Sequence, residues 1–145
     1  ALKALPTAQK RCIHFEITEN LFLDPENNIG NLNFIKDCGF QLSMDDFGTG
    51  YSCLSYLKHF PLDCIKLDCE FTKDLLNCPV DLAITQSVIN LSRDLNIELI
   101  AEGVENEATL TQLKAMGCNL IQGYYFSKPL VDNDFQEFCQ QLKSC

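Results

Sequence analysis

Five short apolar runs, separated by helix-like segments, constrain the fold of this chain more than any other feature of its sequence. The runs lie at residues 12–17, 41–45, 64–67, 98–101 and 120–123. They are nearly continuous in apolar character rather than alternating, which is typical of strands buried on both faces of a parallel sheet. The repeated order of strand and helix therefore predicts an α/β fold with parallel strands and helical crossovers.

The segments between the runs carry start and stop signals for helices. Asp24 followed by Pro25 predicts the beginning of a helix, and Gly39 predicts its end. The longest helix is predicted after Asp81, where apolar residues recur at helical spacing. Two further helices are predicted, one between Asn106 and Gly117 and one starting at Asp132.

Length and composition limit the class of protein. The 145 residues suit one domain, and no apolar run approaches the roughly 18 residues of a membrane span. A net charge of −9 argues against binding to the backbone of DNA or RNA. Nine cysteines without a C-x-x-C pair, and only two histidines, make a zinc or redox protein the weaker hypothesis. We expect reduced cysteines that pack in the core of a cytoplasmic protein, such as Cys12, Cys64 and Cys118.

Polar side chains lie at or just beyond the carboxyl end of each predicted strand. In strand order they are Glu16 and Glu19, then Asp45 and Asp46, then Lys66 and Asp68, then Glu102, and finally Gln122. The carboxyl ends of parallel strands form the edge at which α/β folds and (β/α) barrels bind ligands. A polar group on all five strands therefore predicts a functional site.

The adjacent pair Asp45 and Asp46 suggests a metal centre. Successive side chains of a regular strand point to opposite faces, so both reach one cation only where the backbone turns. Hard divalent cations such as Mg²⁺ prefer oxygen ligands. Glu16, Asp45 and Asp46 suit one ion or a bridged pair, and two ions suit attack on a phosphodiester.

The remaining polar residues suggest complementary roles. Lys66 adds a positive charge for a phosphate or for orienting a nucleophile, and Glu102 is a candidate general base. Gln122 suits the orientation of water or of a neighbouring carboxylate. Less specific interpretations stay open: Asp45 and Asp46 as an N-cap pair before a helix at 47–57, and Gln122 as a core residue together with Tyr124.

Five motifs, in order and covering the chain from about residue 11 onward, resemble the EAL domain family. They are residues 15–19 (FEITE), 45–52 (DDFGTGYS), 65–68 (IKLD), 101–105 (AEGVE) and 122–129 (QGYYFSKP). That family consists of bacterial phosphodiesterases that linearise cyclic di-GMP to pGpG with Mg²⁺ or Mn²⁺ in a modified TIM barrel. The resemblance implies a hydrolase in second-messenger signalling whose ligand is cyclic di-GMP.

The resemblance also implies roles for individual residues. Metal ligation is implied for Glu16, Asp45 and Asp46, and catalytic roles are implied for Lys66 and Glu102. Gln122 matches a glutamine of the last strand that contacts substrate or orients water. Glu19 matches the glutamate that anchors the loop at residues 47–52, where Gly48 and Gly50 provide backbone freedom. In the family this loop couples metal binding to dimerisation, so the resemblance allows a homodimer here. Further signalling domains often accompany the EAL domain in the same protein.

This sequence departs from the family pattern in several places. The Glu-Ala-Leu motif of the first barrel strand is absent, as are the arginine after it and an asparagine metal ligand. A complete (β/α)₈ barrel needs about 250 residues. We therefore expect residues 1–145 to be the C-terminal part of one EAL domain, about five βα units. Ala1 is expected to mark a boundary within a longer protein.

Smaller departures are Cys53, where serine is common, and Cys69-Glu70, where arginine-serine is common. We expect this chain alone to be inactive, because the missing strands supply metal ligands. The alternative is a degenerate EAL module that binds nucleotide or a protein partner without hydrolysis.

Overall fold

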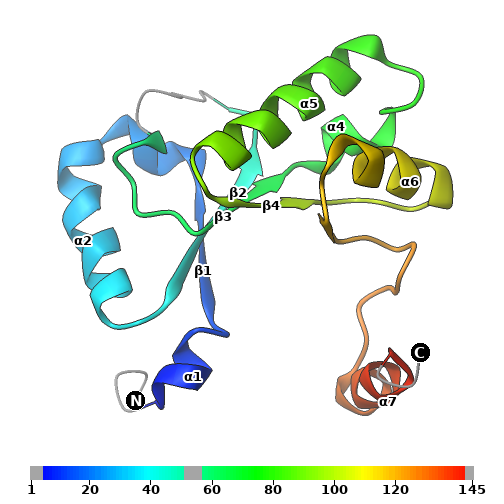
Figure 1. Ribbon diagram of the computed structural model, residues 1–145. Coiled ribbons are helices and arrows are strands. Elements are labelled where there is room, and N and C mark those ends of the chain that lie inside the picture. The colour runs from blue at the N-terminus through cyan, green and yellow to red at the C-terminus, as the bar shows by residue number, and fades with distance from the viewer. Residues whose placement is uncertain (1–4, 51–56, 143–145) are drawn as a thin grey trace.

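A five-stranded parallel sheet forms the centre of the molecule (Figure 1). This computed structural model describes residues 5–50 and 57–142, without the side chains of residues 22, 23, 25 and 26. The strand order follows the chain, β1-β2-β3-β4-β5. The strands are β1 (His14–Thr18), β2 (Gln41–Phe47), β3 (Cys64–Leu67), β4 (Glu98–Ala101) and β5 (Leu120–Ile121). The predicted α/β fold with parallel strands is confirmed.

Helical segments lie between the strands and after the last one. They are α1 (Thr7–Lys10), η2 (Glu19–Leu23, a 3₁₀ helix), α2 (Pro25–Asp37), α4 (Cys69–Lys73), α5 (Pro79–Asp94), α6 (Glu107–Met116) and α7 (Asp132–Leu142). The signals read from the sequence hold for α2, α6 and α7. In α6 the side chain of Asn106 accepts a hydrogen bond from the backbone of Thr109, and Gly117 ends the helix with a φ of 97°. The longest helix, α5, begins at Pro79, two residues before the predicted start.

Three strands differ from their predicted bounds. β1 begins at His14 rather than at residue 12, because the backbone N–H groups of Cys12 and Ile13 bond to the turn that ends α1. β2 continues through Asp45 to Phe47. β5 ends at Ile121, two residues earlier than predicted. The short segments α1, η2 and α4 were not predicted.

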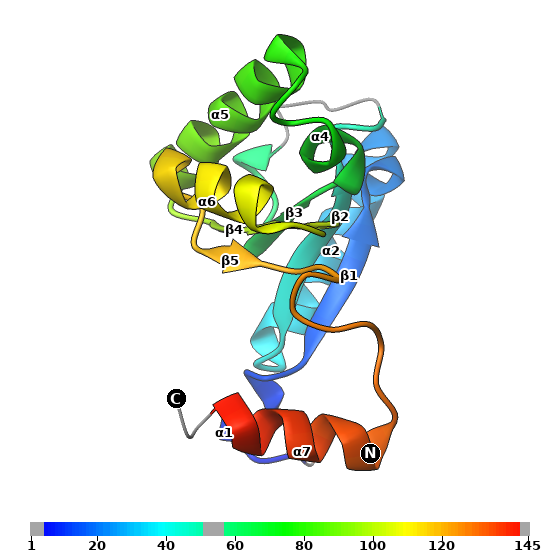
Figure 2. The ribbon, with the colours of Figure 1, turned by 90° about the vertical axis from the view of Figure 1, so that its right-hand side faces the viewer.

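The core lies between the sheet and the helices α2, α5 and α6, which cover its outer side (Figures 1 and 2). Sheet residues at the centre are fully buried, at 0% exposure, among them Leu42, Met44, Ile65 and Leu67. Residues of α5 and α6 such as Val88 and Leu113 pack against this layer. Because side chains alternate along a strand, burial of Leu42 and Met44 under the helices directs Ser43 and Asp45 to the other side.

The last helix, α7, stands apart from the sheet at the end of an extended segment (Figures 1 and 2). None of its residues is buried, and Phe135 and Leu142 are more than half exposed. The predicted helix is present, and its apolar stripe, which includes the half-buried Phe138, is not part of the core. No helix among the described residues has the length and apolar character needed to cross a membrane.

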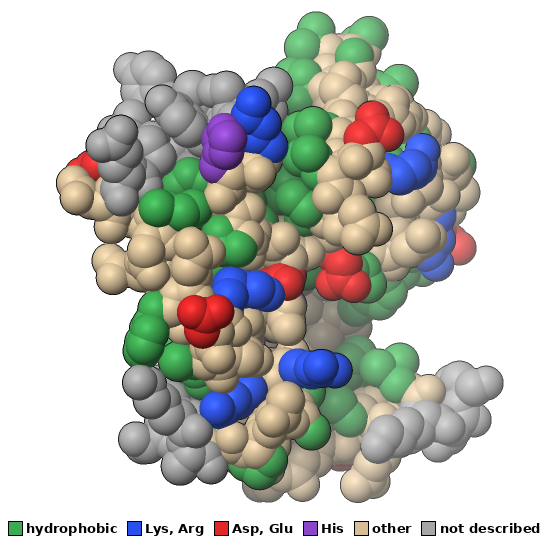
Figure 3. Space-filling model, turned by 60° about the vertical axis from the view of Figure 1, so that its left-hand side comes forward, with side chains coloured by type: hydrophobic (Ala, Val, Ile, Leu, Met, Phe, Trp, Pro, Cys, Tyr) green, Lys and Arg blue, Asp and Glu red, His purple; other side chains and the backbone are tan. Residues whose placement is uncertain are grey.

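The positions of the described cysteines and of the surface charges can be compared with the predictions made from composition. All seven described cysteines are free, and Cys64 and Cys118 are buried as predicted. Cys12 is exposed, so its expected place in the core was wrong, because the turn after α1 leaves it outside the sheet. On the face shown in Figure 3, basic side chains are interleaved with acidic and neutral ones rather than joined in a continuous stripe.

Candidate functional site

The end of β2 brings two adjacent carboxylates to the same side of the sheet. Between β2 and β3 the register shifts: Met44 pairs with Ile65, but Phe47 pairs with Leu67. β2 therefore holds one extra residue, a bulge, and Asp46 there has a φ of 54°. This breaks the strict alternation of a strand. The backbone turn expected at this pair is thus a bulge within β2, and the N-cap interpretation of the pair is wrong.

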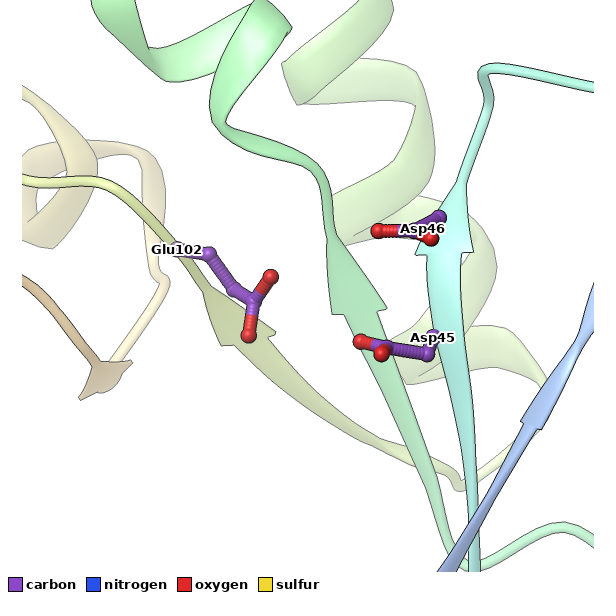
Figure 4. A group of neighbouring side chains, drawn as sticks. All are labelled: Asp45, Asp46 and Glu102. Carbon is purple, nitrogen blue, oxygen red and sulfur yellow. The ribbon is translucent and has the colours of Figure 1, made fainter.

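Asp45, Asp46 and Glu102 form a cluster of three carboxylates. Asp45 and Asp46 come from β2 and Glu102 follows β4, and the three side chains point toward one another across β3 (Figure 4). One oxygen from each lies within 4.8 Å of those of the other two. Neighbouring Asp45, followed by burial and by Asp68, raises the pKa of Asp46 above its ordinary value. The cluster is therefore electrostatically repulsive.

Lys66, on β3 between the two carboxylate-bearing strands, partly balances this charge. Its Nζ lies 2.8 Å from Asp45 Oδ1, 2.8 Å from Glu102 Oε1 and 3.0 Å from Glu16 Oε1. Burial disfavours the charged lysine, but hydrogen bonds to Asp45, Glu102 and Glu16 outweigh it and hold the Lys66 pKa well above its ordinary value. The ammonium is therefore charged at neutral pH.

Four carboxylates around one ammonium leave an excess of negative charge. Glu16 joins the site through Lys66, and its side chain is 53% exposed. It is not among the three carboxylates whose oxygens share the 4.8 Å neighbourhood. The structure thus brings Asp45, Asp46 and Glu102 together directly and connects Glu16, on β1, to this group through Lys66. Such an arrangement suits a divalent cation, which would offset the excess of carboxylates.

The loop after β2 is held by Glu19. Glu19 is buried, and its Oε1 accepts a hydrogen bond from the backbone N–H of Gly48 at 2.8 Å. Gly48 has a φ of +99°, and a Cβ atom at Gly50 would lie 2.6 Å from Glu19 Oε2. The positive φ therefore favours glycine at position 48, and the close approach of the loop to Glu19 favours glycine at position 50. Residues 51 and 52 of the predicted loop, and Cys53, lie outside the described residues.

A pocket of about 550 Å³ adjoins the turn that follows Glu102, since Gly103 is part of its lining. It is lined by α4, by the segment after β4 and by the segment after β5, including Gln122, Tyr124, Lys73, Lys128 and Asn106. Gln122 is exposed and Tyr124 is 57% exposed, so their interpretation as core residues was wrong. The segment after β5 leaves the sheet at Gln122, which turns this side chain toward the pocket.

Sequence reasoning missed the contribution of α4 to the site. Asp68 accepts a hydrogen bond from the backbone N–H of Glu70 and so begins α4. An aspartate directly after a strand is a recognisable N-cap signal. Nothing in the sequence marked Thr72, whose hydroxyl lies 2.5 Å from the carbonyl oxygen of Glu102.

Comparisons with a family model, with related proteins and with solved structures all indicate the same family. The family model described as the EAL domain matches residues 2–129. Cyclic di-GMP phosphodiesterase RocR of Pseudomonas aeruginosa is 39% identical over 128 residues, which cover 88% of this chain and 33% of RocR.

Two solved structures show the same similarity. The PaMucR phosphodiesterase in complex with c-di-GMP has a TM-score of 0.81 at 36% identity, over 84% of this chain and 50% of that chain. Klebsiella pneumoniae BlrP1, in a complex with manganese and cyclic di-GMP, has a TM-score of 0.78 at 36% identity, over 86% of this chain and 31% of that chain. This chain therefore spans half or less of the length of these relatives.

Proposed function

Because this chain belongs to the EAL domain family, we propose that it is part of a metal-dependent phosphodiesterase that hydrolyses cyclic di-GMP to linear pGpG. The predicted fold class, part of a TIM-like barrel, is confirmed by the similarity to solved EAL structures. The observation that carries the proposed activity is the convergence of Asp45, Asp46 and Glu102 around the charged Lys66. RocR and PaMucR, named as phosphodiesterases, support the reaction class.

The carboxylate cluster fits Mg²⁺ or Mn²⁺. We assign Asp45 and Asp46 as ligands, with Glu16 as a further ligand that the structure keeps on Lys66. The raised pKa of Asp46 reports repulsion that a bound cation would relieve. When bound, such a cation lowers the pKa of water and offsets charge on a phosphate. The BlrP1 complex with manganese and cyclic di-GMP supports the choice of metal.

The remaining steps of the proposed reaction are assigned to Glu102 and Lys66. Glu102 Oε accepts the proton of the attacking water, because its carboxylate lies beside both aspartates. Lys66 holds Asp45 and Glu102 in place and presents a fixed positive charge to the phosphate. The water oxygen bonds to phosphorus as its proton passes to Glu102, the bond from phosphorus to the 3′ oxygen breaks, and that oxygen takes a proton from bulk water.

The pocket that adjoins the turn after Glu102 supports a nucleotide as substrate. Its volume of about 550 Å³ lies within the range of small-molecule sites. Gln122 and Asn106 offer amide groups, and Tyr124 offers an aromatic face. We propose that a guanine base enters this pocket while a phosphate faces Lys66. Dimerisation, and fusion of the domain to further signalling domains, stay predictions.

The test is product formation by the natural full-length protein that carries this chain. With Mn²⁺ we expect conversion of cyclic di-GMP to pGpG, measured by chromatography. Asp45→Asn and Glu102→Gln should each reduce the rate at least about 100-fold. Glu107→Gln, which changes an exposed carboxylate in the first turn of α6, is the matched control and should retain the rate.

Each other outcome has a defined meaning. Near-normal pGpG formation by either site variant would overturn the assigned roles. Binding of cyclic di-GMP without hydrolysis, in the presence of Mg²⁺ or Mn²⁺, would replace the enzyme by a non-catalytic nucleotide-binding module. Activity that requires zinc would replace the proposed cofactor.

A further inference from the structure

The short helix α4 lies between the two segments that carry the carboxylate cluster. β3 is the middle strand between β2 and β4, and α4 begins two residues after β3 ends. The chain that leaves β3 therefore has to pass between the end of β2 and the end of β4. Contacts of Cys69, Phe71 and Thr72 show that α4 packs against both ends.

The first contacts are with the backbone that carries Glu102. Thr72 is 1% exposed, and its hydroxyl lies 2.5 Å from the carbonyl oxygen of Glu102 and 3.2 Å from that of Cys69. Its single proton is best directed at the nearer oxygen. The N–H of Glu102 in turn donates to the carbonyl of Leu67 at 3.1 Å. The peptide groups on both sides of Glu102 are thus tied to β3 and α4.

The residue after Glu102 also needs α4 to be close. Gly103 has a φ of +68°, and a Cβ atom there would lie 2.3 Å from the Cβ of Cys69. The turn that presents Glu102 therefore lies in direct contact with the first residue of α4.

The last contact is with the loop after Asp46. The ring of Phe71 is buried, and a Cβ atom at Gly48 would lie 2.7 Å from its Cε2 atom. Asp46, two residues earlier, has a φ of 54°, a conformation that residues other than glycine rarely adopt. Packing of the Gly48 backbone on Phe71 helps to hold that conformation.

We propose that α4 sets the placement of Glu102 relative to Asp46, with Thr72 and Phe71 as positioning residues. Thr72 acts through the backbone of Glu102, and Phe71 acts through the loop that follows Asp46. This inference rests on the proposed function, in which Glu102 adds negative charge beside a cation held by Asp45 and Asp46, so its placement affects the affinity for that cation. It adds two residues that would not contact the cation, and one of them, Thr72, also lines the pocket described above.

The first experiment measures backbone order without metal. Hydrogen exchange of the segment at residues 101–106 is compared in the natural full-length protein and its Thr72→Val variant, which keeps the side-chain shape and removes the hydroxyl. We expect exchange there to be about five- to tenfold faster, as loss of one buried hydrogen bond implies. Thr72→Ser keeps the hydroxyl and should restore protection.

The matched control is Thr85→Val. Thr85 is also a fully buried helical threonine, but its hydroxyl has no hydrogen-bond partner among the described residues. Thr85→Val should leave exchange at residues 101–106 unchanged. Unchanged exchange in Thr72→Val as well would overturn the proposed role of Thr72.

The second experiment measures Mn²⁺ affinity by calorimetry. Thr72→Val should weaken Mn²⁺ binding about fivefold, whereas Thr72→Ser and Thr85→Val should stay within about twofold. On a Glu102→Gln background, Thr72→Val should add no further loss, because it acts through Glu102. Equal affinities of the two valine variants, or additive losses, would overturn the proposal. If the wild type binds no Mn²⁺, the proposed metal-dependent function fails, and the exchange comparison still decides the role of α4.

Phe71 is tested in the same way on the other segment. Phe71→Leu should speed exchange at residues 46–50 about threefold or more and weaken Mn²⁺ binding. Phe40→Leu, at a buried phenylalanine directly before β2, is the control for simple loss of core volume. Equal effects of the two leucine variants on residues 46–50 would remove Phe71 from the proposal.

Discussion

The two edges of the sheet combine lysine and carboxylate side chains in different proportions. At the amino edge, Asp63 accepts hydrogen bonds from Lys36 Nζ at 2.5 Å and from the backbone N–H of Leu42 at 2.8 Å. At the carboxyl edge, one lysine, Lys66, is shared by three carboxylates, and a fourth, Asp46, lies beside them.

This difference separates a stabilising region from the proposed binding region. At the amino edge Lys36 pairs with Asp63, and Asp63 links α2 to β2 just before β3 begins. At the carboxyl edge the excess of carboxylates, and the left-handed Asp46, cost folding free energy. A protein retains such a cost where a ligand uses it. Experiments that alter one edge at a time test this division.

The largest effect on stability is expected from Gly103→Ala. The new Cβ would meet Cys69 at a φ that disfavours alanine, so we expect a loss of about 2–4 kcal/mol in the free energy of unfolding. Gly30→Ala is the control, because a Cβ there meets no atom within 4 Å inside α2. It should increase stability by about 0.5–1 kcal/mol. Urea unfolding measures both, and equal stability of the two variants would show that the Glu102 turn adapts freely.

Cation addition should stabilise the carboxyl edge selectively. Mn²⁺ at about 100 times its dissociation constant should raise the free energy of unfolding by about 2.7 kcal/mol. Thermal unfolding with and without Mn²⁺ measures the change, and removal of the ion by a chelator should reverse it. Asp45→Asn should lose most of this gain, since it removes a ligand from the cluster. Equal stabilisation of wild type and Asp45→Asn would place the cation elsewhere.

Removal of Asp63 should weaken the opposite edge without affecting the response to cation. Asp63→Ala leaves Lys36 and the Leu42 N–H without their acceptor, so we expect a loss of about 1–2 kcal/mol in urea unfolding. Asp37→Ala changes the exposed acidic neighbour of Lys36 and should alter stability by less than about 0.5 kcal/mol. The gain from Mn²⁺ should be the same in Asp63→Ala as in the wild type. A smaller gain would show that the two edges are coupled.

The sequence predicted most of the fold because its signals are local. Caps such as Asn106, and continuous apolar runs such as residues 64–67, indicate where elements begin and which strands are buried. Parallel pairing then places the strand ends at one edge, so the meeting of Asp45, Lys66 and Glu102 followed from the order of elements alone.

The missing parts depend on distant contacts. The bulge that turns Asp45 and Asp46 to one side is a property of the register between two strands. The five residues of α4 have an N-cap in Asp68 but too little length for a helical pattern. The function of Thr72 depends on a carbonyl 30 residues away in the chain. No pattern within either segment contains that information.

The smallest effect is expected from a thiol that lies between the two edges. Cys64 is the first residue of β3 and lies between Asp63 and Lys66 in the sequence. Its exposure is 0%. Burial, opposed in part by a hydrogen bond with Ser43, raises its pKa from 9.0 to about 11. The folded chain therefore binds this proton more tightly than the unfolded chain. Stability from this group is full below pH 9 and is lost as the pH rises from about 9 to about 11.

Comparison of pH profiles isolates this thiol from the edges. Between pH 9 and 10 the wild type should lose about 1 kcal/mol more than Cys64→Ala, measured by urea unfolding at each pH. Ile65→Val, a change at the next buried residue, should lower stability at every pH without changing the slope. Lys66 is present in both proteins, so its contribution to the alkaline slope cancels in the comparison. Equal slopes for wild type and Cys64→Ala would mean that groups at one of the two edges, rather than the thiol between them, set the alkaline limit of stability.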